Sequence, residues 1–236
     1  MDASTHSATV VPLGIGYYTI PEAARLLKIA PRSIARWLGG YRYETHGKSA
    51  YMPPLWEPEL PAAEHHLELS FRDLIELRFV KAFMDAGLGL KVIRVCLDYA
   101  KGCVSNSHPF STRKFRTDGK TIFLESAAQS RDPELLDLRK QQYVLRDVIA
   151  KTFKDLDIED DAVARWRPYR GKQTIVIDPK RLFGQPIAAS IGVPTMVLFD
   201  AVEAEGSIER AAHLFEVDKS VLNDAINFEK SLMAAA

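Results

Sequence analysis

The sequence predicts a mainly α-helical protein with small β elements. Three observations predict this class. Apolar residues recur at helical spacing along most of the chain, Ser, Thr, Asp and Gly bound these stretches, and alternation typical of strands is confined to short segments. Of the 236 residues, 47% are hydrophobic and 26% are charged, which is the composition of a globular chain. This length allows one large domain or two to three small ones.

The first predicted elements are two short helices joined by a tight turn. Thr19 and Glu22 form a capping-box pattern at a helix start, and Pro31 suits the first turn of the next helix because its missing N–H costs nothing there. This arrangement is typical of a helix-turn-helix. The apolar face of the second helix consists of Ile34, Trp37 and Leu38. The opposite face carries Arg32, Ser33 and Arg36.

A β-hairpin is predicted directly after the second helix. Gly39 and Gly40 end that helix, residues 41–44 alternate like a strand, and the chain turns at His46 and Gly47 into a strand over 49–52. This hairpin is the wing of a winged helix-turn-helix. The proline-rich stretch 53–61 is expected to run extended around it.

Charge is distributed unevenly along the chain, although the formal net charge is +0. Residues 17–52 hold six basic side chains against two acidic ones, whereas residues 200–236 hold three against eight. Because phosphate binding needs basic surface, the N-terminal excess predicts DNA as a partner. We expect Arg32, Ser33 and Arg36 to read base edges in a major groove, and Arg42 and Lys48 on the wing to contact phosphate.

The middle of the chain is predicted to be helical with one β-hairpin. Helices are expected from Ser70 through Asp85, with Gly87 as the stop, from Leu90 to about Lys101, and from Arg131 to Phe153. Between them, Asp118-Gly119 predicts a hairpin over Lys114–Leu124. Residues 155–161 are interpreted as an acidic connector.

The C-terminal part is predicted to hold one short strand and a second, acidic helix-turn-helix pattern. The strand covers Thr174–Asp178, one helix runs from Ser207 through Phe215, and Asp218 caps the last helix. We therefore divide the chain into a flexible arm (1–16), a winged helix-turn-helix (17–62), a helical middle region (63–160) and a helical C-terminal domain (161–236).

Two extended motifs resemble known families. Tyr18–Ala24, Arg36–Leu38, the Gly40–Tyr43 wing, Leu69–Leu74 and Ala86–Leu90 together resemble a MerR-type winged helix. Val176–Pro179, Phe183–Pro186, Gly192–Thr195, Glu205–Ser207 and Ala225–Glu229 resemble the domain-of-unknown-function family numbered 433. The two signatures in this order are similar to a VapB-like antitoxin group whose partner toxin is a PIN-domain ribonuclease. The resemblance implies repression of the protein's own operon and neutralisation of that nuclease.

Partner-contact residues follow from this implied toxin. A PIN-type nuclease binds Mg²⁺ through clustered carboxylates, so the guanidinium of Arg165, Arg167 or Arg170 is a candidate to occupy the place of the metal. The alternative interpretation of residues 165–170 is a structural corner in which Trp166 is buried and the arginines are solvated. The apolar face of the last helix is open to two interpretations, an internal core or a helix laid into a partner groove. Its candidate toxin-binding residues are Val221, Leu222 and Phe228.

Other function classes have weaker support. Cys96 and Cys103 lie near His108, but free cysteines are usually core residues and no closed four-ligand set is present, so we expect no metal and no cofactor. No nucleotide-binding or nucleophile motif occurs, so an enzyme is not expected. No signal peptide or membrane span is found, which predicts a cytoplasmic protein. Because repressors of this kind match two-fold operators with paired recognition helices, we expect a homodimer or a higher toxin–antitoxin hetero-oligomer. The alternatives are a MerR-like regulator that senses a small molecule or metal through the middle region, and a protein-binding adaptor.

Overall fold

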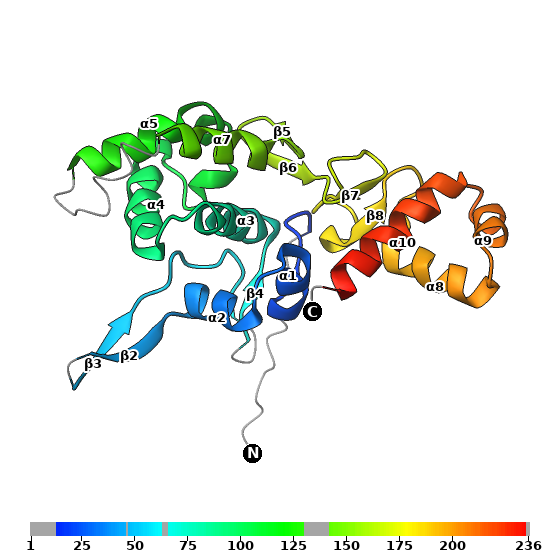
Figure 1. The fold of residues 1–236 in the computed structure, drawn as a ribbon, viewed down its shortest axis with the longest axis horizontal. Helices are drawn as coiled ribbons and strands as arrows, with labels where there is room; N and C mark the ends of the chain where they lie inside the picture. Colours follow the sequence, from blue (N-terminus) through cyan, green and yellow to red (C-terminus); the bar gives the residue numbers. More distant parts are fainter. Residues whose placement is uncertain (1–12, 46, 63–65, 130–141, 235–236) are drawn as a thin grey trace, which may run out of the picture.

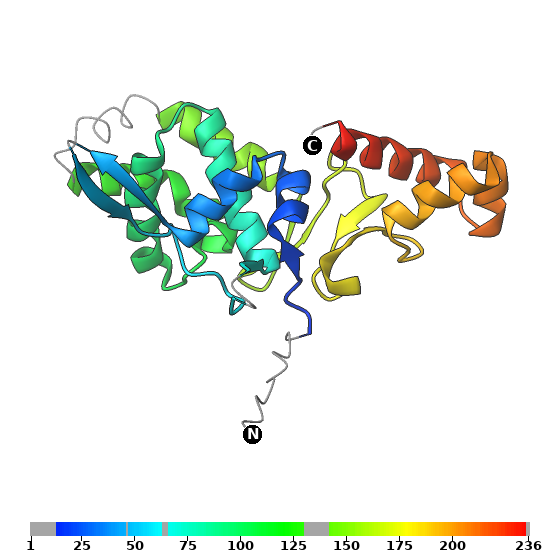
Figure 2. The ribbon, with the colours of Figure 1, turned by 90° about the horizontal axis from the view of Figure 1, so that it is seen from below.

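The computed structural model describes residues 13–45, 47–62, 66–129 and 142–234. Helices dominate, and the strands form two-stranded and four-stranded antiparallel sheets, which confirms the predicted fold class. The wing and the last helices lie at opposite ends of the elongated molecule (Figures 1 and 2). Among the described residues, no helix is long and apolar enough to cross a membrane.

The N-terminal unit has the predicted winged helix-turn-helix elements. The capping box of Thr19 and Glu22 is present at the start of the first helix, α1. The wing strands pair antiparallel with Tyr41 opposite Met52, and His46 in the turn lies outside the described residues. Gly40 enters the wing at a φ of 68°. The elements are α1 (Ile20–Leu27), α2 (Pro31–Gly39), β2 (Tyr41–Thr45) and β3 (Lys48–Met52).

Two further contacts close this unit. Strand β1 (Tyr18–Thr19) pairs with β4 (Glu68–Leu69), which brings the chain back beside its start. Between wing and β4, the proline-rich stretch runs without regular structure but is anchored, because Leu55 and Trp56 are buried and the Leu55 N–H donates to the Trp37 carbonyl at 2.7 Å. The wing hairpin extends away from the helices (Figure 1).

The middle region packs four helices around an aromatic core. Phe79 of α3 lies 4.8 Å from the ring of Phe153 and 5.9 Å from that of Phe115, so α3, α7 and α5 meet there. The capping box of Ser70 and Asp73 is present at the start of α3. The elements are α3 (Phe71–Asp85), α4 (Leu90–Val104), the short 3-10 helix η1 (Pro109–Ser111), α5 (Arg113–Gln129) and α7 (Gln142–Phe153).

The hairpin predicted over Lys114–Leu124 is wrong, because this segment lies inside α5. Phe115, Ile122 and Phe123 are buried on one face of that helix. Glycine is needed at position 119, because a Cβ there would lie only 3.0 Å from the Phe115 ring and 3.1 Å from Ile149 Cδ1. Tertiary packing therefore outweighs the local Asp-Gly turn signal. Of the helix predicted over Arg131–Phe153, residues 130–141 lie outside the described residues and α7 forms the rest.

A four-stranded antiparallel sheet in the order β5-β6-β7-β8 connects the middle region to the C-terminal helices. The predicted acidic connector at 155–161 is wrong, because most of it forms β5 and the turn into β6. The predicted strand at 174–178 is confirmed as β7. The elements are β5 (Leu156–Glu159), β6 (Ala162–Trp166), β7 (Ile175–Ile177), the 3-10 helix η2 (Leu182–Gly184) and β8 (Pro186–Ala188).

Three helices end the chain, α8 (Thr195–Glu205), α9 (Ile208–Leu214) and α10 (Lys219–Met233). Helices α9 and α10 confirm the predicted pair, and α8 was not predicted. A small hydrophobic cluster holds Leu198 of α8, Ala211 of α9 and Leu222 of α10 together. Phe228 and Leu232 of α10 belong instead to the large cluster that begins at Tyr18. The C-terminal helix is thus packed against the N-terminal unit as well as against its own neighbours.

The last residues of the predicted flexible arm are held by the fold. The Phe71 N–H donates to the carbonyl of Ile15 at 2.8 Å, and Gly16 is buried against Phe71. Residues 1–12 of that arm lie outside the described residues. Ile15 and Gly16 are therefore anchored on the start of α3.

Candidate nucleic-acid interface and partner contacts

The predicted DNA-contact side chains lie together on one helix and its wing. On α2, Arg32 and Arg36 are exposed and Ser33 is half-buried, while Ile34, Trp37 and Leu38 point into the core. Arg42 on β2 and Lys48 on β3 are exposed too. Within the described part of the chain, none of these four basic side chains has a carboxylate partner. Their charge is therefore available to an external anion.

Arg36 has a defined orientation on this surface. Its guanidinium carbon lies 3.9 Å from the centroid of the Tyr41 ring, the first residue of the wing. Such stacking holds the planar guanidinium and leaves its N–H groups free at the edge. The wing thus orients a side chain of α2, a contact that the sequence did not predict.

The arginines of 165–170 differ from one another in their contacts. Arg165 Nη2 lies 2.6 Å from Glu159 Oε1, and Arg167 Nη2 lies 3.0 Å from Asp157 Oδ1. Arg170 is exposed at a φ of 54°, and its guanidinium carbon lies 5.4 Å from the Tyr169 ring centroid. Arg165 and Arg167 are therefore neutralised within the chain, whereas Arg170 is directed to solvent without a carboxylate partner among the described residues.

The predicted apolar contact residues of the last helix are mostly internal. Leu222 is 0% and Phe228 3% exposed, one in each hydrophobic cluster, and Val221 is half-buried. Of the two interpretations of this face, the internal core applies to Leu222 and Phe228. Exposed apolar side chains on the neighbouring helices are Val197 of α8 and Leu214 of α9, at 46% and 62% exposure.

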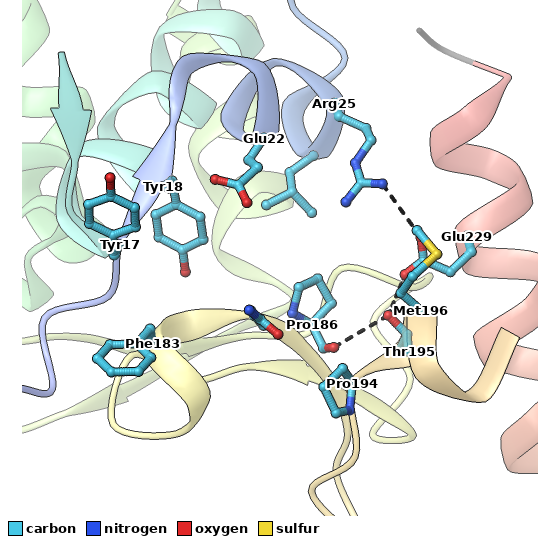
Figure 3. A pocket seen from close by; sticks show the side chains of 12 residues that line it. Tyr17, Tyr18, Glu22, Arg25, Phe183, Pro186, Pro194, Thr195, Met196 and Glu229 are labelled. Carbon is cyan, nitrogen blue, oxygen red and sulfur yellow. Dashed lines mark hydrogen bonds and ion pairs between the residues drawn. The ribbon is translucent and has the colours of Figure 1, made fainter. Parts of the chain in front are cut away.

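A pocket of about 570 Å³ lies between the N-terminal unit and the C-terminal helices (Figure 3). Tyr18 closes one side, because its hydroxyl donates to the Gly184 carbonyl at 2.8 Å. Glu229 of α10 faces Arg25 of α1 with 4.0 Å between Oε2 and Nη1. This site was not predicted, because its walls come from segments up to about two hundred residues apart. The signal in the sequence was that the motifs 18–24, 183–186, 192–195 and 225–229 each contribute to it.

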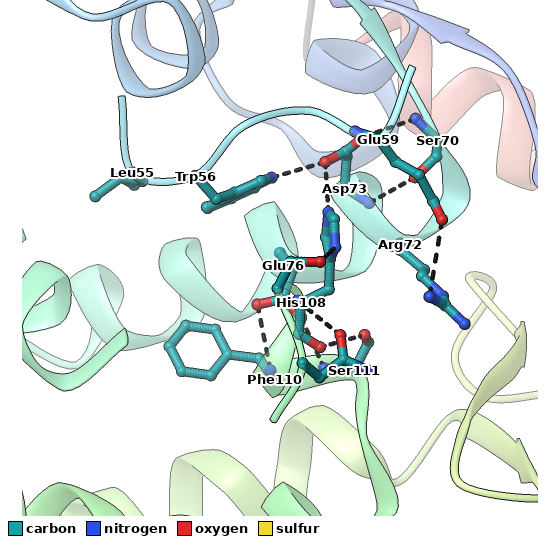
Figure 4. Close-up of polar contacts among 12 residues, drawn as sticks. Leu55, Trp56, Glu59, Ser70, Arg72, Asp73, Glu76, His108, Phe110 and Ser111 are labelled. Atoms are coloured by element: carbon teal, nitrogen blue, oxygen red, sulfur yellow. Dashed lines mark hydrogen bonds and ion pairs between the residues drawn. The ribbon is translucent and has the colours of Figure 1, made fainter. Parts of the chain in front are cut away.

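A buried polar network fixes the proline-rich stretch to the middle region (Figure 4). Asp73 accepts hydrogen bonds from Trp56 Nε1 at 2.7 Å and from the Ser70 N–H, and lies 2.8 Å from His108 Nε2. Burial favours a raised pKa for Asp73, but these hydrogen bonds and the His108 charge lower it. Burial likewise opposes protonation of His108, but Asp73 and Glu76 raise its pKa. The network thus holds the proline-rich stretch, through Trp56, against α3.

Glu76 is the second carboxyl of this network. It is fully buried and accepts hydrogen bonds from the N–H groups of Phe110 and Ser111 at 3.2 and 2.8 Å. Burial raises the pKa of Glu76 to about 7, and His108 and the two N–H groups only partly offset this. A carboxyl that titrates near neutrality is therefore built into the core of the middle region.

The two cysteines occupy different environments. Cys96 is buried, its Sγ lies 3.1 Å from Ser126 Oγ, and burial raises the pKa of its thiol to about 12. Cys103 is half-buried, and His108 is engaged by Asp73 and Ser107. No group of three metal-ligating side chains occurs among the described residues. A protonated, hydrogen-bonded thiol such as Cys96 is a poor metal ligand or redox nucleophile.

Comparisons with known proteins find similarity both to a known sequence and to a solved structure. No protein-family model matches the chain, so the resemblances to MerR-type and family-433 domains stay predictions. The chain is 26% identical over 224 residues to a Mycobacterium tuberculosis protein named "Putative antitoxin VapB45", covering 89% of this chain and 92% of that protein. The crystal structure of Rv2018 from Mycobacterium tuberculosis superposes with a TM-score of 0.74 at 24% identity, covering 92% of this chain and 100% of that one. The structural match shows the fold, and the sequence match shows a distant similarity to a protein named as an antitoxin.

Proposed function

We propose that this protein is the antitoxin and autorepressor of a toxin–antitoxin pair whose toxin is a PIN-domain ribonuclease. The observation that carries the proposal is the 26% identity to a protein named as a VapB antitoxin, because it extends over nearly the whole of both chains. An isolated shared DNA-binding module would match only part of the chain.

Operator binding is assigned to residues 17–62. Arg32, Arg36, Arg42 and Lys48 support it, because they are exposed and have no carboxylate partner in the described part of the chain. Neutralising phosphates with such side chains releases counterions, and reading guanine requires a free guanidinium edge. The chain would act as a homodimer, since two-fold operators are matched by paired recognition helices.

Toxin contact is assigned to residues 161–236, at the end of the molecule away from the wing. The acidic balance of the last helices complements a nuclease that must offer basic surface to RNA. Within 165–170 we assign the contact with the metal-binding carboxylates to Arg170, because Arg165 and Arg167 would first have to leave Glu159 and Asp157. Apolar contact is assigned to Val197 and Leu214, with Val221 at the margin, in place of the buried Leu222 and Phe228.

The experiment is co-expression of the full chain with the ribonuclease encoded beside it, followed by purification and mass measurement. The proposal predicts a stable complex without ribonuclease activity. The double variant Arg32→Ala/Arg36→Ala should still neutralise the toxin but lose operator binding, and Arg170→Ala should do the reverse. Arg146→Ala, an exposed arginine on α7, is the matched control and should change neither. Free chain and active nuclease after co-expression would reject the antitoxin role.

A further inference from the structure

The pocket between α1 and the C-terminal helices has the dimensions and composition of a small-molecule site. Its volume of about 570 Å³ lies within the ordinary range for ligand pockets, roughly 300–1,000 Å³. Tyr17, Tyr18 and Phe183 contribute aromatic rings, and Leu26, Pro186 and Met196 contribute apolar surface. The walls thus suit an organic molecule with an apolar or aromatic body.

One buried carboxylate oxygen in this pocket has no hydrogen-bond partner among the residues that the structure describes. Glu229 is 1% exposed, and its Oε1 accepts the hydroxyl proton of Thr195, whereas none of the described residues donates to its Oε2. Arg25 Nη1 lies 4.0 Å from Oε2, which is beyond hydrogen-bond distance. Burying a carboxylate oxygen without a hydrogen bond destabilises the folded protein. A ligand that donates a hydrogen bond to this oxygen removes that cost, which favours its binding.

The charges around the pocket select a cation. The lining holds two carboxylates, Glu22 and Glu229, against the single guanidinium of Arg25. Glu22 is exposed to water and accepts from the backbone N–H and hydroxyl of Thr19, whereas Glu229 is the buried carboxylate of the pocket. The Arg25 side chain is 34% exposed and is able to turn toward solvent when a second cation enters. An anion, in contrast, would be repelled by both carboxylates.

We propose that this pocket binds a small organic cation, an amine, amidine or guanidine with an apolar or aromatic body, whose charged group donates to Glu229. The aromatic rings of Tyr17, Tyr18 and Phe183 lie on the side of the pocket away from Glu229, where they can pack against the apolar or aromatic body of the ligand (Figure 3). The ligand would bridge α1 of the N-terminal unit and α10 of the C-terminal part. This inference concerns binding alone and holds or fails independently of the proposed antitoxin role.

Three probes of one shape and different charge test the proposal on the full chain: benzamidine, the neutral benzamide and the anionic benzoate. Binding is measured by ligand-detected NMR and by the shift in thermal unfolding. For a fragment of this size we expect a Kd for benzamidine of about 10 mM or tighter. Benzamide and benzoate should bind at least about tenfold more weakly, because each lacks the charge-assisted hydrogen bond.

Two variants and one control decide the site. Glu229→Gln keeps the shape and an acceptor for Thr195 and should weaken benzamidine binding about tenfold or more. Met196→Trp fills the pocket and should abolish binding even if Glu229→Gln folds poorly. Glu203→Gln, an exposed glutamate of α8, should bind like the wild type. The proposal would be overturned by equal binding of the three probes or by retained benzamidine binding in either pocket variant. It would also be overturned if the wild type did not bind benzamidine at a concentration of about 10 mM, the expected Kd.

Discussion

Replacing Arg36 with alanine removes the guanidinium that lies 3.9 Å above the Tyr41 ring. If this group reads a guanine, the loss is about 1–3 kcal/mol, which corresponds to roughly 5- to 150-fold in operator Kd. Because Arg36 is exposed and its cation–π contact is worth only about 0.5–1 kcal/mol, the fold should survive the substitution. The variant therefore separates DNA reading from stability.

The assay is fluorescence anisotropy with the DNA upstream of the protein's own gene and with a random duplex of equal length, at two salt concentrations. Arg36→Ala should weaken binding to the upstream DNA far more than to random DNA. Arg36→Lys keeps the charge but not the planar fork, so it should retain random-duplex affinity and lose specificity. Lys48→Ala should weaken both duplexes alike and lower the salt slope by about 0.9. Unchanged operator affinity in Arg36→Ala, or an equal loss on both duplexes, would refute the groove assignment.

Three further predictions concern the wing, the buried network and the toxin contact. Gly40→Ala places a Cβ against the Tyr51 hydroxyl and 2.8 Å from the Met52 carbonyl oxygen, at a φ of 68°, so denaturant unfolding should show a loss of about 1–3 kcal/mol. The loss should clearly exceed that of Gly47→Ala, where no atom of the described residues lies within 4 Å. Because the pKa of Glu76 rises to about 7 on folding, its contribution to the free energy of unfolding is fully present below pH 4.5 and is lost as the pH rises through 7. Glu76→Gln should therefore flatten the decline of stability across this window in urea titrations, and an unchanged slope would contradict the assignment. Arg170→Ala should reduce toxin inhibition in a ribonuclease assay more than Arg165→Ala does, since Arg165, unlike Arg170, has carboxylate partners among the described residues. The opposite order would refute the choice of arginine.

Short-range signals were the most reliable part of the sequence. The capping boxes at Thr19 and Ser70 depend on residues three positions apart, and both form as predicted. The Asp118-Gly119 signal is equally local but failed, because Gly119 is needed for close packing against Phe115 inside a helix. A turn pattern and a tight helix contact both favour glycine, and only the tertiary neighbours distinguish them.

The candidate sites also differ in whether they depend on neighbouring or on distant residues. The side chains that we assign to DNA contact lie on one helix and the adjoining hairpin, so their grouping follows from periodicity. In contrast, the pocket joins Arg25 to Glu229, and the buried network joins Asp73 to His108, across contacts that no periodicity encodes. The sequence left two interpretations of Phe228, core or partner contact, because its core neighbours include residues of the distant N-terminal unit.

The central claim is that this chain inhibits a PIN-domain ribonuclease by direct binding. The most direct measurement is a titration of the purified product of the neighbouring gene with the full chain, following cleavage of a fluorescent RNA. The account predicts that activity falls linearly to background at a fixed stoichiometric ratio and that Arg32→Ala/Arg36→Ala inhibits as well as the wild type. Full ribonuclease activity at a large excess of the chain would contradict it.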